Sequence, residues 1–242
     1  MWRSLVAHTH GVRGVAGSNP VIPTFNIILN FKMLKHLCLE ERLNVYSHFT
    51  GVILSVIGIL NIFYSYPPKS FSSKISLTIY GASIIFLFLA SSIYHSIASK
   101  EKKIIWQKID HIGIYFLIAG TYTPVTMTIL KEGSGNVILF AVWMLALFGI
   151  VYKIYFINKF VNLSLILYLV MGWLVIIDFK NIISLFLKDE LFYLIIGGVF
   201  YTFGTLFYKY EKIYLNHFLW HLFVLLGAGS HLAMITLIYS RL

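Results

Sequence analysis

Cysteine and charge are both scarce in this chain. Cys38 is the single cysteine among 242 residues, which excludes an internal disulfide and a metal cage built from thiolates. Charged residues make up only 12% of the sequence. The connections between its apolar runs hold a few residues to about a dozen, which is too few for a separate soluble domain.

Long apolar runs dominate the sequence instead. Hydrophobic residues make up 59% of the chain, and they repeatedly extend over about 20 residues, the length that a helix needs to cross a bilayer. Barrel strands would alternate in polarity, so we predict an all-α fold. The expected protein is a multi-pass, seven-transmembrane helix bundle of the cell membrane (the cytoplasmic or inner membrane). Its candidate spans are 44–66, 75–98, 110–130, 136–156, 161–177, 191–208 and 217–239.

Basic residues are in excess, and their positions indicate topology. The formal net charge is +10, but the basic residues form no patch with interleaved aromatics, so we expect no nucleic-acid partner. Most of them precede the first span or follow the second, fourth or sixth: Lys32, Lys35, Arg42, Lys100, Lys102, Lys103, Lys108, Lys153, Lys159, Lys209 and Lys212. The other side has Lys69, Lys74, Lys131, Lys180, Lys188 and Arg241. The positive-inside rule predicts a cytoplasmic N-terminus and a C-terminus outside.

Residues 1–32 differ in composition from the rest of the chain. The segment from His10 to Pro20 is rich in glycine, and its Gly-Ser-Asn-Pro can be encoded by GGTTCGAATCC, which resembles a conserved arm of transfer RNA genes. We expect 1–32 to be a spurious extension that results from a misassigned start, with Met33 as the natural initiator. Residues 33–43 would then form a cytoplasmic segment, and 44–242 would form the seven-transmembrane domain. A cleavable signal peptide is the alternative, but no apolar region of adequate length precedes residue 30. His8 and His10 are therefore excluded from the site.

The last apolar run contains His217 and His221. They are four residues apart, so on a helix both imidazoles lie on one face about a turn apart, a spacing that suits metal ligands. Polar side chains are costly in a membrane span and are tolerated mainly where they meet a partner, a metal or water. One such histidine alone is more often a packing residue, so the interpretation depends on what else lies nearby.

Two further spans bring polar residues to the same depth. Ser91 and His95 share a helix face near the cytoplasmic end of the second span, and Asp110 and His111 begin the third span on that side. Because the seventh span starts there with its histidine pair, we expect one cluster from three helices. His111 cannot point the same way as its neighbour, and we predict it to be interfacial or to lie behind the ligands.

Two other histidines are placed by the same reasoning. His48 falls in the first turns of the first span, also on the cytoplasmic side, with Asn44 about one turn and Glu41 about two turns earlier. His231 lies beyond His221 by about 15 Å of helix rise. We predict that His231 is too far outward to join the cluster.

This set of residues favours a catalytic zinc site. His95, His217 and His221 would bind Zn²⁺ and leave the fourth tetrahedral position to water, whose pKa falls to roughly 7 on the metal. Asp110 would accept or orient the water's proton, and Ser91 would support it. A substrate that arrives through the bilayer would be a membrane lipid with an ester or amide bond. The residues thus predict a zinc-dependent lipid hydrolase.

Two other functions remain open on the residues alone. A cytolysin or channel would need a polar-lined helix, and no span has a clear polar stripe apart from the histidines. A haem-binding electron carrier would need histidines on facing helices across a wide apolar slot. The pair on one helix suits a compact ion better.

The same residues carry a resemblance to a known family. Four blocks in order resemble the signatures of the hemolysin III family: Glu41-x-x-Asn44-x-x-x-His48-x-x-Gly51, Ser91-x-x-Tyr94-His95, Asp110-His111-x-x-Ile114 with 118–124, and His217-x-x-Trp220-His221-x-Phe223-Val224. That family is similar to the progestin and adiponectin receptors. The resemblance implies seven helices, a cytoplasmic-side zinc site with the same three ligands, and hemolytic or pore-forming activity. It also leaves open a receptor that uses the zinc structurally.

The charge pattern generates a topology prediction. A periplasm-active reporter fused to Leu242 should be active, and a cytoplasm-active reporter at the same position should be silent, because an odd number of spans separates the basic N-terminal segment from the C-terminus. The opposite pair of results would contradict the predicted orientation.

Overall fold

The computed structural model describes residues 34, 37–157, 159, 161–210 and 212–242. The proposed extension at 1–32, which contains His8 and His10, lies outside these residues, and so does Met33. Within the described ranges every regular element is helical, so the all-α prediction is confirmed.

Seven long helices account for most of the described chain. They are α2 (Leu39–Ser65), α3 (Phe71–Ser96), α4 (Lys100–Thr128), α5 (Gly135–Phe156), α6 (Val161–Gly172), α8 (Lys188–Lys209) and α9 (Asn216–Arg241). A 3₁₀ turn, η2 (Leu174–Asp178), and a short helix, α7 (Phe179–Leu185), follow α6. The predicted fifth span, 161–177, therefore breaks after Gly172 and continues as η2 and α7.

In the part of the chain that the structure describes, six helical segments are long and apolar enough to cross a membrane: α2, α3, α5, the run Asn162–Leu185, α8 and α9. Helix α4 spans 29 residues but is more polar. Its first turns carry Lys100, Glu101 and Lys103, and its last turns carry threonines around Pro124. The predicted third span, 110–130, thus starts in the middle of a helix, because the charged segment before Asp110 continues the same helix.

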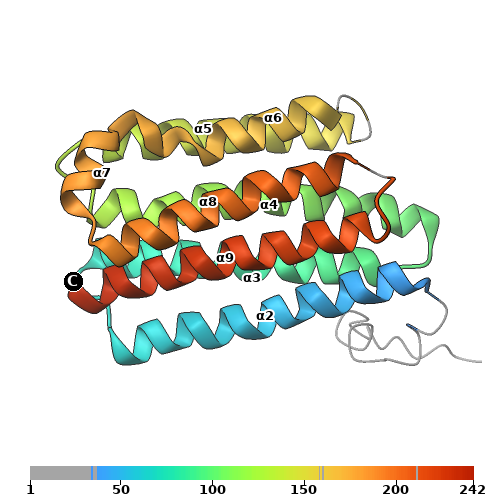
Figure 1. Ribbon diagram of the computed structural model, residues 1–242, viewed down its shortest axis with the longest axis horizontal. Coiled ribbons are helices and arrows are strands. Elements are labelled where there is room, and N and C mark those ends of the chain that lie inside the picture. The colour runs from blue at the N-terminus through green and yellow to red at the C-terminus, as the bar shows by residue number, and fades with distance from the viewer. Residues whose placement is uncertain (1–33, 35–36, 158, 160, 211) are drawn as a thin grey trace, which may run out of the picture.

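The helices run side by side along the long axis of the molecule (Figure 1). Helix α3 packs against α2 and α4, and α9 packs against α8 and α2. Buried side chains such as Leu77, Tyr80 and Ile84 of α3 meet Met234 and Ile235 of α9 in one apolar core. Because successive helices alternate in direction, the starts of α2, α4 and α9 and the end of α3 gather at one end (Figure 1, right).

The opposite end carries an ion pair whose carboxylate is buried. Glu190, at the start of α8, is fully buried, and its carboxylate accepts hydrogen bonds from Arg241 Nε at 2.6 Å and from another guanidinium nitrogen of Arg241 at 3.0 Å. The same carboxylate accepts the Leu187 backbone N–H at 2.8 Å. This contact joins the end of α9 to the start of α8, and we call it the Glu190–Arg241 clamp.

The clamp should contribute measurably to stability. Arg241→Ala leaves the Glu190 carboxylate buried without its cation, which costs about 1.5–3 kcal/mol for charged hydrogen bonds of a partly exposed pair. We expect a lower Tm in detergent by thermal unfolding. Lys188→Ala, which removes an exposed cation from the same helix start, should leave the Tm unchanged. Equal Tm values for both variants would contradict the role of the clamp.

Candidate metal centre

Three histidines converge at the end of the bundle opposite the clamp. His95 comes from the end of α3, and His217 and His221 come from the first turns of α9. Each histidine has a ring nitrogen that lies within 4.8 Å of a ring nitrogen of each of the other two. Their ring centroids are 4.8–5.0 Å apart. The structure therefore brings together the three residues that the spacing singles out.

The first turn of α9 is held by contacts from two other helices. Leu215 has φ 54° and turns the chain into α9, and the Asn216 amide donates to the Phe207 carbonyl at 3.1 Å. The His217 backbone N–H donates to Glu40 Oε1 of α2 at 3.1 Å. The first N–H groups of a helix have no partner within the helix, so Glu40 caps α9 at the point where its histidines begin.

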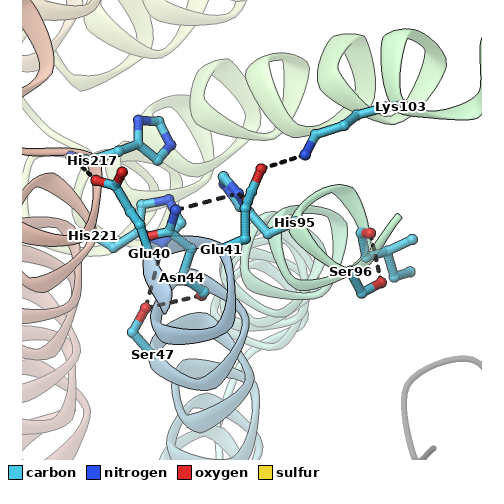
Figure 2. A network of polar contacts seen from close by, with 10 residues as sticks. Glu40, Glu41, Asn44, Ser47, His95, Ser96, Lys103, His217 and His221 are labelled. Carbon is cyan, nitrogen blue, oxygen red and sulfur yellow. Dashed lines mark hydrogen bonds and ion pairs between the residues drawn. The ribbon is translucent and has the colours of Figure 1, made fainter. Parts of the chain in front are cut away.

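His95 is linked through Glu41 to a third helix. Its Nδ1 lies 2.5 Å from Glu41 Oε2, and the other oxygen of that carboxylate accepts a hydrogen bond from Lys103 of α4 (Figure 2). The second ring nitrogen of His95, Nε2, is buried and has no hydrogen-bond partner. That nitrogen is available to a ligand.

His221 has a similar contact on its Nδ1. Ser47 Oγ lies 3.4 Å from that nitrogen, and the same hydroxyl donates to the Asn44 carbonyl at 3.0 Å (Figure 2). A hydroxyl that donates elsewhere accepts from its neighbour. His221 Nδ1 then carries the proton, which leaves Nε2 as the nitrogen with a free lone pair.

A fourth histidine packs directly on this group. The ring of His48 stacks on that of His221 with centroids 3.6 Å apart and planes 12° apart, and it meets the edge of Phe88. His48 is 3% exposed, and neither of its ring nitrogens has a hydrogen-bond partner. Sequence reasoning placed His48 at this end but gave it no role.

The predicted acid and hydroxyl lie beside the cluster. Asp110 of α4 and Ser91 of α3 are both buried and line the same cavity as His48, His217 and His221. Ser91 Oγ has no hydrogen-bond partner. His95 lies with the α9 pair, and Asp110 and Ser91 line the cavity beside it. The chemical role of each residue stays a prediction.

Two further histidines of the described residues, His111 and His231, line the same cavity. His111 is buried, and its backbone carbonyl accepts the Tyr168 hydroxyl at 3.2 Å. Its predicted place, interfacial or behind the ligands, stays a prediction. His231 lies deeper along α9, with its Nε2 3.3 Å from the Leu194 carbonyl. A Cβ added at Gly197 would lie 2.4 Å from the His231 ring, so a glycine is needed there for close packing of α8 on α9.

An apolar cavity extends from the histidines into the bundle. Its empty volume is about 990 Å³, which includes space open to its surroundings, and side chains of α2, α3, α4, α6, α8 and α9 line it. Leu87, Leu117, Leu169, Trp173 and Val224 make up much of the wall. Ser91, Asp110, His217 and His221 line the part at the candidate metal centre, and His231 lines a part deeper along α9. The cavity thus joins the candidate metal centre to a largely apolar wall.

The donor set fits a zinc ion. Neutral imidazoles are preferred zinc ligands, and a ligating histidine ordinarily gives its other ring N–H to a carboxylate or another acceptor. Glu41 meets Nδ1 of His95 and Ser47 meets Nδ1 of His221. The Nε2 atom of His95 is a buried polar atom without a partner, as expected for a nitrogen that would hold a metal.

Four residues of this centre were given no role from the sequence: Glu41, Asn44, Ser47 and Lys103. The signal for the first two was present, because Glu41, Asn44 and His48 share one face of α2 at helical spacing. Nothing in the sequence pairs Lys103 with Glu41, since that contact depends on how α4 packs against α2.

Comparison with known proteins identifies what the chain resembles. A family model described as "Haemolysin-III related" matches residues 36–232. The chain is 43% identical over 192 residues to "Hemolysin-3 homolog" of Bacillus subtilis (strain 168), which covers 79% of this chain and 90% of the relative. It is 37% identical over 191 residues to "Hemolysin-3" of Bacillus cereus, with 78% and 87% covered. "Monocyte to macrophage differentiation factor" of Homo sapiens is 28% identical over 207 residues, with 81% and 83% covered.

The geometry generates a metal-binding prediction. His95→Ala, His217→Ala and His221→Ala should each lose most bound zinc, because each change removes a bond to the ion. Elemental analysis of the detergent-purified protein measures this loss. His231→Ala is the control and should keep the wild-type metal content, since His231 lies deeper along α9. Equal metal in wild type and in the His221→Ala variant would rule out the centre.

Proposed function

The chain belongs to the haemolysin-III-related family, and we propose that it is a membrane enzyme that uses zinc to hydrolyse ester or amide bonds of lipids. The coarser description, an integral multi-pass membrane protein of this family, follows from the matched relatives and the six apolar helices.

One observation carries the proposal. Three candidate metal ligands lie together, and two of them, His217 and His221, line a largely apolar cavity along with the acid Asp110 and the hydroxyl of Ser91. A lipid with a carbonyl near its head and a long chain matches that arrangement, because the chain can occupy the apolar part while the carbonyl meets the candidate metal centre. A water-soluble substrate would leave the apolar wall without a partner.

The metal and the residues that hold it have distinct roles. His95, His217 and His221 would bind the ion, and a zinc ion held there supplies a Lewis acid that polarises a carbonyl and makes water more acidic. His48, stacked on His221 at 3.6 Å, closes the space beside that ligand. Its packing keeps the His221 ring in one orientation and excludes bulk water from that side.

Asp110 and Ser91 would move and hold the proton. In hydrolysis, water oxygen adds to the carbonyl carbon, and the bond from that carbon to the leaving oxygen or nitrogen breaks. The Asp110 carboxylate would take one proton from water and return it to the leaving atom. Ser91, whose Oγ has no other partner, would donate to Asp110 or to the substrate oxygen and orient either one.

We include α4 as the seventh span and place the centre on the cytoplasmic side. Helix α4 packs between α3 and α5 along the bundle, and its neighbours on both sides are apolar enough to cross the membrane. Lys100, Lys103 and Lys108 lie at its start, at the same end as the histidines. This orientation agrees with the positive-inside rule.

Two alternatives use the same architecture. Cytolysis is suggested by the names of the Bacillus relatives, but a water-filled pore would require a polar path along the bundle, and the cavity wall is largely apolar. A receptor would bind lipid in the cavity and keep zinc as a structural ion. Turnover of lipid separates the enzyme from both.

Asp110 provides the decisive variant. Asp110→Asn should keep most of its zinc yet lose hydrolysis of long-chain ester or amide lipids by 100-fold or more, on the order expected when a general acid–base group is removed. Released fatty acid measured by mass spectrometry, alongside zinc content, tests both effects. Asp189→Asn, which makes the same change at an exposed carboxylate outside the cavity, is the control and should retain turnover. Zinc without any turnover in the wild type would contradict the enzyme.

A further inference from the structure

A carboxylate at the mouth of the centre contacts one candidate ligand directly. Glu41 lies in the first turn of α2, and its Oε2 is 2.5 Å from Nδ1 of His95. His95 is 3% exposed and Glu41 is 23% exposed. The contact joins α2 to the end of α3 and is shielded from water on the histidine side.

Lys103 fixes the position of that carboxylate. Its ammonium group donates to Glu41 Oε1 and also lies 5.4 Å from the centre of the Tyr94 ring. Tyr94 in turn meets the His95 ring edge to face, with centroids 4.5 Å apart. The Glu41 carboxylate of α2 is therefore held between His95 of α3 on one oxygen and Lys103 of α4 on the other (Figure 2).

From these contacts we propose that Glu41, anchored by Lys103, is a positioning residue that fixes the tautomer and orientation of His95 for metal binding. The inference rests on the zinc centre of the proposed function. An ion-paired carboxylate accepts hydrogen bonds and donates none. His95 Nδ1 must then carry the proton, which leaves the lone pair on Nε2, the buried nitrogen that has no partner.

Asn44 supports the same tautomer. Its amide nitrogen lies 3.4 Å from His95 Nδ1, and its Oδ1 is buried without a partner. Turning the amide by half a turn exchanges these two atoms. His95 Nδ1–H then has a second acceptor, and the unpartnered oxygen is satisfied. Ser47 holds Nδ1 of His221 in the corresponding way, so two ligands are oriented by residues of α2.

Zinc affinity of the full-length protein tests the proposal. Glu41→Ala should bind zinc about 10- to 100-fold more weakly than wild type in competition with a chelator, as is typical when the partner of a ligating histidine is removed. Glu41→Gln, which keeps one acceptor oxygen, should fall between the two. Lys103→Ala should also weaken binding, because the carboxylate loses its anchor. Glu101→Ala, an exposed carboxylate at the same end, should bind as wild type does.

A second readout separates positioning from simple stabilisation. The visible spectrum of the cobalt-substituted protein reports ligand geometry, and we expect it to change in Glu41→Ala and to recover in part in Glu41→Gln. If Glu41 only joined helices, the Tm of the metal-free protein would fall while zinc affinity and the cobalt spectrum stayed the same, and that result would overturn the proposal. A wild type that binds no zinc would overturn it as well.

The outcomes also distinguish this inference from the enzyme proposal. If wild-type protein binds zinc and hydrolyses no lipid, the enzyme proposal fails, while the affinity series across Glu41→Ala, Glu41→Gln and Glu101→Ala still decides the role of Glu41.

Discussion

Polar side chains buried in an apolar bundle have to satisfy one another, and the rest of this structure depends on that constraint. A buried polar group without a partner costs free energy comparable to a lost hydrogen bond or more. The histidines, Glu41 and Asp110 come from four helices, so their contacts fix how those helices meet at one end. The Glu190–Arg241 clamp does the same at the other end.

The position of the centre could be predicted because helical spacing and span order suffice for it. The intervals Ser91 to His95 and His217 to His221 define faces of two helices, and alternating spans bring those faces to one depth. The contacts of Glu41 could not be predicted in this way. They depend on the rotation of α2 against α3 and α4, and no periodicity within one helix specifies rotation against another.

The boundaries of α4 and α6 differ from the prediction for a different reason. Hydropathy marks where a segment becomes apolar, whereas a helix ends where its backbone hydrogen bonding ends. Helix α4 begins at Lys100 because charged residues continue the same hydrogen-bonded turns. After α6, Trp173 and η2 interrupt a run that is apolar throughout. Tyr122 stabilises this break, since its hydroxyl donates to the Gly172 carbonyl and accepts the Val175 N–H.

The Glu190–Arg241 clamp holds one end of α9, and the histidines lie at the other end. Between Arg241 and His217 the helix is about 36 Å long at 1.5 Å per residue, so a tilt of about 2° at the clamp moves the backbone of His217 by about 1 Å. Functional constellations tolerate displacements of only about 0.5 Å. The Glu40 cap and the packing of α9 on α8 and α2 oppose such a tilt, so the clamp and these contacts together hold the histidines within that tolerance.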